Sequence, residues 1–195
     1  MKSTIALVAI AGFAAAASAQ NFSLSINAPT EVTEGAVFTI DVIGDADTGT
    51  HMLGGGFSLT SGSGLIADMA WTPAEWSAFN TDNGYAGNGD HAGVIFGQLL
   101  IFGIPGFDVP GEGSDLGMSI GSFQVTLGAG SGVIDFALNA GEPFTLQSYD
   151  VNDGATASSA DGQLVLNGAS VTVTPAPSAL ALLGLGGLAA GRRRR

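Results

Sequence analysis

The sequence predicts an all-β protein, an antiparallel β-sandwich for which a jelly-roll topology is the natural variant. Apolar and polar residues alternate with a period of two in most of the body, which is typical of half-buried strands. Glycine, aspartate, asparagine and proline separate these runs, as they do in turns. About 155 of the 195 residues, numbers 20–174, show this pattern, and a body of this length supports one ordinary hydrophobic core.

The predicted strands follow one another along residues 20–173, the range assigned to the sandwich domain. Each strand is recognised by large apolar residues at alternate positions, which a strand directs to the same face of a sheet. These positions are Phe22, Leu24 and Ile26; Phe38, Ile40 and Val42; Phe57 and Leu59; Phe123, Val125 and Leu127; Ile134, Phe136 and Leu138; Leu164 and Leu166; and Val171 and Val173.

Two segments depart from this alternation. Residues 94–102 are almost continuously apolar, which predicts a central strand covered on both faces. Thr72-Pro73-Ala74-Glu75 has the pattern of a helix N-terminus, with a capping box and proline at the first helical position. A short helix is therefore predicted near residues 73–80, with Trp76 and Phe79 packing it against the sandwich.

The segment Val32-Thr-Glu-Gly35-Ala-Val-Phe38-Thr-Ile-Asp-Val42 resembles the opening of cohesin-type and related carbohydrate-associated β-sandwich modules. In those modules a Val-x-x-Gly turn leads into the first core strand. Gly121-Ser-Phe123-Gln-Val125 is similar to a later strand of the same fold. The resemblance implies a cohesin-like, nine-stranded sandwich, and it does not identify a ligand.

The N-terminus has the three parts of a secretory signal peptide. Lys2 supplies a short positive region, residues 5–17 form an apolar stretch, and Ala17-Ser18-Ala19 matches an Ala-x-Ala cleavage site. A buried N-terminal helix is the alternative, but a helix without a polar face suits export better than packing. The sequence therefore predicts that residues 1–19 are removed and that the protein is exported.

The C-terminus combines a proline motif, an apolar run and a basic end. Pro175-Ala176-Pro177 precedes an apolar segment at residues 179–191, and Arg192, Arg193, Arg194 and Arg195 end the chain. This arrangement resembles the PEP-CTERM sorting signal of Gram-negative and planctomycete-type bacteria, which an exosortase reads and processes, although alanine replaces the glutamate of Pro-Glu-Pro. The resemblance implies a cell-surface or extracellular protein that passes the inner membrane, in an exopolysaccharide or biofilm setting.

Residues 174–195 are accordingly interpreted as a linker and sorting signal, and both chain ends are expected to form apolar helices. About 13 apolar residues at ~1.5 Å per residue span roughly 20 Å, short of the ~30 Å hydrocarbon core of a bilayer. The arginines would stay on the cytoplasmic side, which places the body outside. Transient or marginal membrane association followed by processing is favoured over a permanent anchor.

The five basic residues of the chain, Lys2 and the four terminal arginines, all lie in the two targeting segments. Residues 20–174 hold all 17 carboxylates and no Lys or Arg, so the body alone has a formal charge of −17. Binding to nucleic acid is not expected, because its affinity comes from cationic side chains that neutralise phosphates. The like charges also repel one another and weaken the compact state unless salt or divalent cations screen them.

The sequence predicts that the protein is not an enzyme. The chain has no cysteine, which excludes a cysteine nucleophile and a thiolate metal site. It also has no glycine-rich phosphate-binding loop that carries a lysine. His51 and His91 have no metal-binding spacing. With Asp90 they could form a zinc site, but two ordinary surface histidines are the favoured interpretation. Paired carboxylates could serve glycoside hydrolysis, yet 17 acids make such pairs common by chance.

Three oxygen-rich loops are candidate calcium sites, because hard cations prefer carboxylate and amide oxygens. Turn chemistry explains each loop as well, since Asp, Asn and Gly tolerate left-handed backbone. A domain without internal cations would nevertheless gain most from a bound one, so calcium is a candidate cofactor and the sequence requires none. The loops contain Asp45 and Asp47; residues 82–90; and Asp150, Asn152 and Asp153.

Trp71 and Tyr85 are candidate ligand-binding residues, because each offers an apolar face with a polar edge beside loop sequence, which suits stacking on sugars. The function that best fits all these features is that of an exported, surface-sorted acidic β-sandwich with a structural or adhesive role in the cell envelope or extracellular matrix. A carbohydrate-binding module is the first alternative and a secreted hydrolase the second. The expected partners are the export machinery, an exosortase-type enzyme and extracellular polysaccharide.

Overall fold

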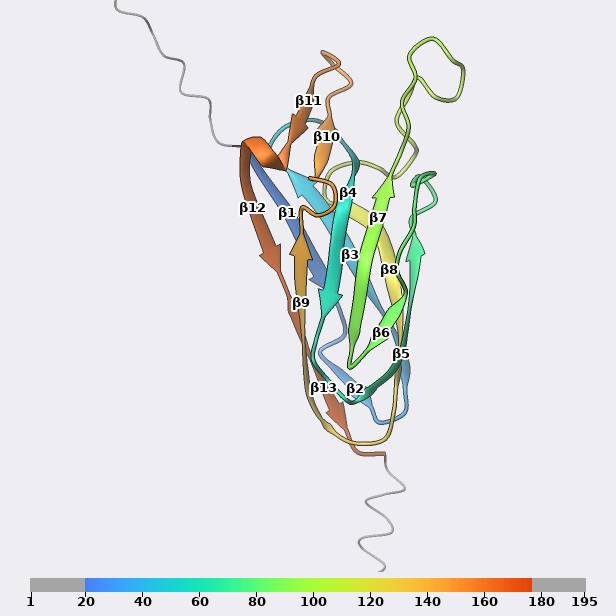
Figure 1. Cartoon of the computed structure of the whole chain (residues 1–195), viewed down its shortest axis with the longest axis vertical. Coiled ribbons are helices and arrows are strands. Elements are labelled where there is room, and N and C mark those ends of the chain that lie inside the picture. Colours follow the sequence, from blue (N-terminus) through green and yellow to red (C-terminus); the bar gives the residue numbers. More distant parts are fainter. Residues whose placement is uncertain (1–19, 177–195) are drawn as a thin grey trace, which may run out of the picture.

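The chain folds into a sandwich of two β-sheets (Figure 1). The structure, a computed structural model, describes residues 20–176. All neighbouring strands of the first sheet are antiparallel except β1 and β12, which are parallel. Its five strands lie in the order β12 (Gly162–Asn167), β1 (Gln20–Asn27), β3 (Val37–Ala46), β8 (Met118–Leu127) and β5 (Ile66–Pro73).

The second sheet is organised around β4 (His51–Thr60). One edge of β4 pairs with β7 (Asp90–Gly97), which in turn pairs with β6 (Tyr85–Gly87). The other edge is shared, because Gly54 pairs with β10 (Gln147–Tyr149) and Phe57 with β9 (Gly132–Ala140). The sheet continues from β10 to β11 (Thr156–Ser158), and from β9 to β13 (Ala169–Thr174) and β2 (Glu31–Thr33); a 3-10 turn, Ser159–Asp161, precedes β12.

The alternating apolar residues lie between the two sheets, as the sequence predicts. Full burial of one such side chain contributes about 1.5–3 kcal/mol, so this row of residues supplies most of the driving force for folding. The sandwich prediction is therefore confirmed, and β12 is the exception, since Leu166 at the margin of its sheet is 37% exposed. The buried residues include Phe22, Leu24, Ile40, Val42, Phe57, Leu59, Phe123, Val125, Leu127, Ile134, Phe136, Leu138, Val171 and Val173.

The helix predicted near residues 73–80 is wrong. Thr72 and Pro73 are the last residues of β5 and pair with Ser122 and Gly121 of β8. Because this ladder holds Thr72 in the sheet, only a short turn follows, in which Ser77 N donates to Ala74 O (2.9 Å). Trp76 is buried as predicted, but Phe79 is 63% exposed and does not pack into the core.

The central strand predicted for residues 94–102 ends at Gly97, so its second half is also wrong. A Pro105-Gly106 turn folds the chain back, and Ile101 N donates to Phe107 O (2.5 Å). Leu99 and Phe102 are therefore exposed, at 58% and 67%. Local backbone bonding replaces the expected sheet pairing here.

Several predictions about the chain ends lie outside the described residues. They are the signal peptide at residues 1–19, the two apolar terminal helices, and the sorting signal from Pro177 onward. Within residues 20–176, no helix is long and apolar enough to span a membrane. Pro175 follows the last strand and is exposed, while Ala176 N donates to Glu34 Oε2 (3.4 Å).

Candidate partner-binding surface

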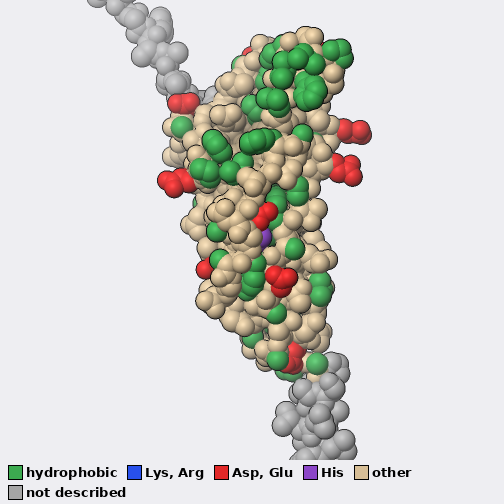
Figure 2. Space-filling view, turned by 45° about the vertical axis from the view of Figure 1, so that its right-hand side comes forward, with side chains coloured by type: hydrophobic (Ala, Val, Ile, Leu, Met, Phe, Trp, Pro, Cys, Tyr) green, Lys and Arg blue, Asp and Glu red, His purple; other side chains and the backbone are tan. Residues whose placement is uncertain are grey.

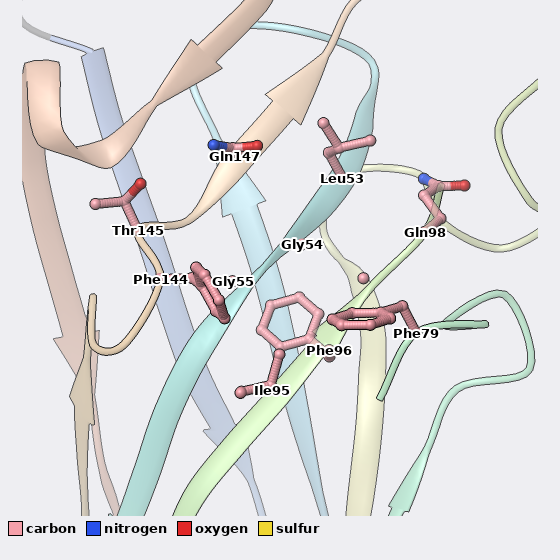
Figure 3. Close-up of a pocket in the computed structure, with 11 residues that line it drawn as sticks. Leu53, Gly54, Gly55, Phe79, Ile95, Phe96, Gln98, Phe144, Thr145 and Gln147 are labelled. Carbon is pink, nitrogen blue, oxygen red and sulfur yellow. The ribbon is translucent and has the colours of Figure 1, made fainter. Parts of the chain in front are cut away.

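A groove of about 230 Å³ crosses strands β4 and β7. Phe79 and Phe144 line opposite sides of it, and Figure 3 shows their rings beside β7 and β4 respectively. Phe144 is also exposed, at 54%. The floor includes glycine backbone from Gly54 and Gly55 of β4 and Gly97 of β7. The groove is therefore bounded by aromatic rings and has a floor that a partner can approach closely.

Backbone hydrogen bonds hold the two aromatic residues above their strands. Phe79 N donates to Gly97 O (3.0 Å), and Gly56 N donates to Phe144 O (3.0 Å). The chain that carries each ring is thus bonded to the strand beneath it. Such pre-organisation reduces the entropy that binding a partner would cost.

The glycines of β4 are required by close backbone packing. A Cβ atom on Gly54 would lie 2.7 Å from Phe96 O and 2.9 Å from Gly97 Cα. A Cβ atom on Gly56 would lie 2.8 Å from Glu142 O. The neighbouring chain therefore approaches β4 too closely for side chains at these positions, and at Gly54 this leaves the lining of the groove without a side chain.

The chain between β7 and β8 forms an apolar loop, residues 98–110, that projects from one end of the sandwich (Figure 1). A second cavity of about 250 Å³ lies at its base and shares Leu53 and Gln98 with the groove. Figure 2 shows hydrophobic side chains gathered at this end of the molecule and again below it. The groove and the apolar loop together are called the apolar surface below. The exposed side chains of the loop are Leu99, Ile101, Phe102, Ile104, Phe107 and Val109.

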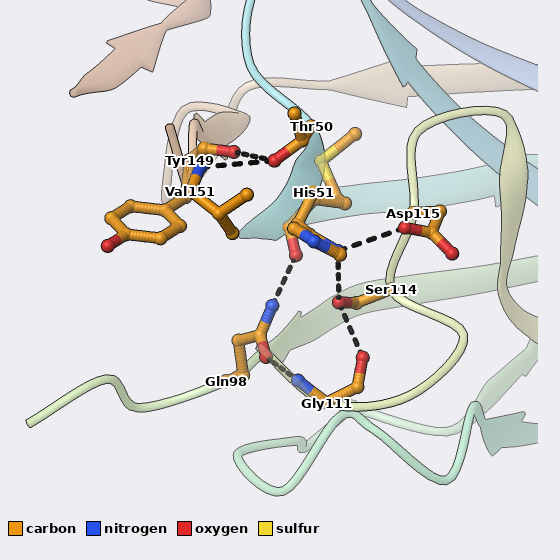
Figure 4. Close-up of polar contacts among 9 residues, drawn as sticks. Thr50, His51, Gln98, Gly111, Ser114, Asp115, Tyr149 and Val151 are labelled. Atoms are coloured by element: carbon orange, nitrogen blue, oxygen red, sulfur yellow. Dashed lines mark hydrogen bonds and ion pairs between the residues drawn. The ribbon is translucent and has the colours of Figure 1, made fainter. Parts of the chain in front are cut away.

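A polar network fastens the base of the apolar loop to β4 (Figure 4). Gln98 bridges the two, because its Nε2 donates to Met52 O (2.7 Å) and its Oε1 accepts from Gly111 N (2.7 Å). Ser114 Oγ donates to Gly111 O (2.7 Å), and Met52 N donates to Ser114 O (2.7 Å). Both ends of the loop are thus held against the same strand.

His51, Ser114 and Asp115 meet at this base, but not in the geometry of a catalytic relay (Figure 4). His51 Nδ1 lies 3.2 Å from Ser114 Oγ and 3.2 Å from Asp115 Oδ1. A relay needs the serine and the carboxylate on opposite ring nitrogens, so that one nitrogen takes a proton while the other is held. Ser114 is also fully buried. The trio therefore stabilises the loop base and does not activate a nucleophile.

The pentapeptide Gly117-Met118-Ser119-Ile120-Gly121 has the Gly-x-Ser-x-Gly pattern of a nucleophile elbow. In an elbow the serine occupies a sharp turn between a strand and a helix. Ser119 instead lies in β8, where its Oγ donates to Gly121 O (3.1 Å) and accepts from Gly121 N (3.2 Å). Ser119 is therefore a strand residue bonded to the neighbouring backbone, and it does not have the position of a nucleophile elbow.

The charged residues near the apolar surface are acidic. Residues 20–176 contain no Lys or Arg, so every formal charge near this surface is a carboxylate or a histidine. A charged rim around an apolar centre is the usual anatomy of a protein interface. Five exposed carboxylates lie in the apolar loop or within five residues of the groove or loop along the chain: Glu75, Asp108, Glu112, Asp115 and Glu142.

The candidate calcium ligands already take part in hydrogen bonds within the chain. Asp45, Asp150 and Asp153 each accept from a residue one or two positions further along, as Asp side chains do in turns. Asp47 instead accepts from Asn21 of β1, and Asn152 donates to Asp150. Over residues 20–176, no three His, Asp or Glu side chains gather in a way that could hold a metal ion. Calcium binding therefore stays a prediction. The bonds run from Ala46 N to Asp45 Oδ1 (2.9 Å), Asn21 Nδ2 to Asp47 Oδ2 (2.6 Å), Asn152 N to Asp150 Oδ1 (2.8 Å) and Ala155 N to Asp153 Oδ1 (2.8 Å).

Trp71 and Tyr85 lie away from the apolar surface. The ring of Trp71 packs against Phe123 at a centroid distance of 4.7 Å. The hydroxyl of Tyr85 donates to Ile66 O (2.8 Å) and accepts from Gly89 N (3.0 Å). Both residues have a structural role in this arrangement, and ligand binding by them stays a prediction.

The two histidines belong to separate networks. His91 is 2% exposed, so it is not the surface histidine that the sequence suggested. Its Nε2 lies 2.9 Å from Asp82 Oδ1, and its ring meets Phe123 edge-on at 5.0 Å. The structure therefore does not bring His51, His91 and Asp90 together as zinc ligands.

Sequence reasoning missed the residues of the apolar surface. Phe79 was expected in the core, and Phe144 was not singled out. The cue for the loop was present, because Gly103, Pro105 and Gly106 interrupt an apolar run and turn residues of this kind end strands. No local pattern marks Phe144 as exposed.

No protein-family model matches the chain, and neither does any curated protein sequence. Several solved structures are similar to it, and two of them are described here. One is a cohesin module of a family 33 glycoside hydrolase from Clostridium perfringens, with 14% identity over 81% of this chain and 98% of that chain, at a TM-score of 0.50. The other is the seventh ScaB type I cohesin from Pseudobacteroides cellulosolvens, with 13% identity over 81% and 94%, at a TM-score of 0.54. This likeness shows that the body has a cohesin-like β-sandwich fold.

Proposed function

We propose that this protein is an exported, non-catalytic β-sandwich with a structural or adhesive role in the cell envelope or extracellular matrix. It acts by docking a protein partner on the apolar surface. The observation that carries this proposal is the apolar surface itself, where a pre-organised groove continues into a projecting loop with six exposed apolar side chains. Exposed apolar patches of this kind are costly in water and typically mark interaction sites.

The acidic surrounding indicates the chemistry of the partner. Complementary interfaces match an acidic rim with a basic one, and unlike charges also speed the encounter. The partner would therefore present an apolar centre among Lys or Arg side chains, and its affinity would fall as salt screens the rim. The cohesin-like fold is consistent with a binding module, and the relay-incompatible geometry of His51 supports a non-catalytic role.

Replacing Phe102 and Phe107 by serine is expected to weaken attachment of the protein to its host matrix at least about ten-fold. The reason is that large exposed aromatic side chains, when buried by a partner, supply most of an interface's binding free energy. The measurement is a binding isotherm of labelled purified protein on matrix prepared from the host.

The matched control replaces Val37 and Val133 by serine, because these side chains are similarly exposed, at 56% and 60%, but lie on β3 and β9. Equal loss in both double variants would refute a specific role for the apolar loop. Binding that survives protease treatment of the matrix but not polysaccharide digestion would establish the carbohydrate-binding alternative instead.

Delivery is a second part of the proposal. The protein is sorted to the surface by removal of the signal peptide after Ala19 and of the tail near Pro177, through an exosortase-type enzyme. We expect the intact mass of protein recovered from the host's surface and medium to lack both segments. A mass that includes Arg192 to Arg195 would rule out exosortase processing and make the tail a membrane anchor.

A further inference from the structure

All but one of the edge strands of the two sheets are protected from pairing with another chain. An open strand edge presents unpaired N–H and C=O groups, which proteins shield with charges, proline or very short strands. The edge strand β5 contains Asp68 and Pro73, and the hydroxyl of Tyr85 donates to Ile66 O at its start. The edge strands β2, β6 and β11 are only three residues long.

The remaining edge strand, β12, has none of these devices. It runs for six residues, Gly162–Asn167, without a charge, a proline or a shift in register. It pairs with β1 on one side, and among the described strands none pairs with its other side. Figure 1 shows β12 on the left-hand outline of the molecule. Val165 and Leu166 are exposed there, at 45% and 37%.

We infer that β12 is a self-association site, at which β12 of a second copy adds in antiparallel orientation and joins the two five-stranded sheets into one. The distribution of charge selects a second copy as the occupant. Neither β12 nor its neighbour β1 contains a charged residue, although the body carries 17 carboxylates. Two copies can therefore approach along this edge with the least repulsion.

Charge also selects the antiparallel orientation. Asp161 directly precedes β12. Parallel pairing would place the two Asp161 side chains next to each other, whereas antiparallel pairing separates them by the length of the strand, about 20 Å at ~3.3 Å per residue. The pairing is isologous, so one edge is complementary to itself under a two-fold axis.

The association is weak and strengthened by salt. A six-residue pairing buries less than the ~800 Å² per partner of a standard interface, so we expect micromolar or weaker affinity. The body of each copy, residues 20–174, carries a formal charge of −17, and salt screens the repulsion between the two bodies. This salt dependence is opposite in sign to that expected for a basic partner on the apolar surface, so the two sites are distinguishable.

Sedimentation equilibrium of purified protein at increasing concentration and salt tests this inference. We expect a monomer–dimer equilibrium that Val165→Glu weakens at least ten-fold, because the new carboxylates would meet across the two-fold axis. Val133→Glu is the matched control, since it makes the same change at an exposed valine of β9, which is paired with β13. Its dimerisation should equal that of the wild type. Amides of β12 should gain protection from hydrogen exchange only in the dimer.

Cross-linking supplies a second readout that adds no charge to the chain. The protein contains no cysteine, so Val165→Cys introduces a single thiol at the proposed interface. Mild oxidation should give a disulfide-linked dimer of Val165→Cys and not of Val133→Cys. A wild-type protein that stays monomeric at about millimolar concentration in high salt, or a Val165→Glu variant that dimerises like the wild type, would overturn the inference.

Discussion

Replacing Phe57 by alanine is expected to lower the free energy of unfolding by about 3–5 kcal/mol. Phe57 is fully buried, and its ring meets three other aromatic rings edge-on. The centroid distances are 5.4 Å to Trp71, 6.0 Å to Phe96 and 6.2 Å to Phe123. Trp71 and Phe123 belong to the first sheet and Phe96 to the second, so Phe57 fills the space between them.

The size of this effect has two sources. Truncation removes apolar burial and leaves a cavity that strands on both sides cannot close, because each is fixed in its own hydrogen-bonded ladder. It also removes edge-to-face contacts worth ~0.5–1.5 kcal/mol each beyond their area. Domains of this size are usually stable by only about 5–15 kcal/mol, so the loss is a large fraction of the total.

Urea denaturation followed by tryptophan fluorescence measures this change directly. Phe107→Ala is the matched control, because it makes the same truncation at an exposed side chain of the apolar loop and should change stability by less than about 0.5 kcal/mol. A loss below ~1 kcal/mol for Phe57→Ala would mean that the two sheets do not share the core described here.

The substitution Gly54→Ala is expected to destabilise the protein by about 1–3 kcal/mol or more. The added methyl group would meet the backbone, at 2.7 Å from Phe96 O and 2.9 Å from Gly97 Cα. Backbone atoms in a sheet cannot rotate away as a flexible side chain can, so β4 and β7 must separate. Because these strands form the floor of the groove, partner binding should fall together with stability.

The control for this prediction is Gly64→Ala. Gly64 has no neighbour within 4 Å of an added Cβ, and its φ is not in the left-handed region. Alanine there should leave stability unchanged or raise it by ~0.4–1 kcal/mol, by restricting the unfolded chain. Equal melting temperatures for the two variants would contradict the close approach of β4 to β7.

Strand positions were predictable because burial between two sheets imposes a period of two on the sequence itself. Phe123 and Val125, for example, alternate with polar residues and are buried. The helix near 73–80 was predicted from a local capping pattern, and it failed because Thr72 is paired with Ser122, which is 50 positions away. The free energy that local helix propensity contributes is small compared with that of a ladder of hydrogen bonds and a shared core.

The amino-acid sequence is sufficient to predict the all-β class and most core residues, and it shows that all Lys and Arg residues lie near the chain ends. Each of these properties depends on composition or on the spacing of residues along one strand. The positions of the apolar surface and of the open β12 edge depend instead on how the strands pair. Phe79 and Phe144 share a groove only because β4 pairs with β7 on one edge and β10 on the other. Which strands are neighbours, and hence which apolar side chains stay uncovered, depends on contacts between distant segments that no local pattern records.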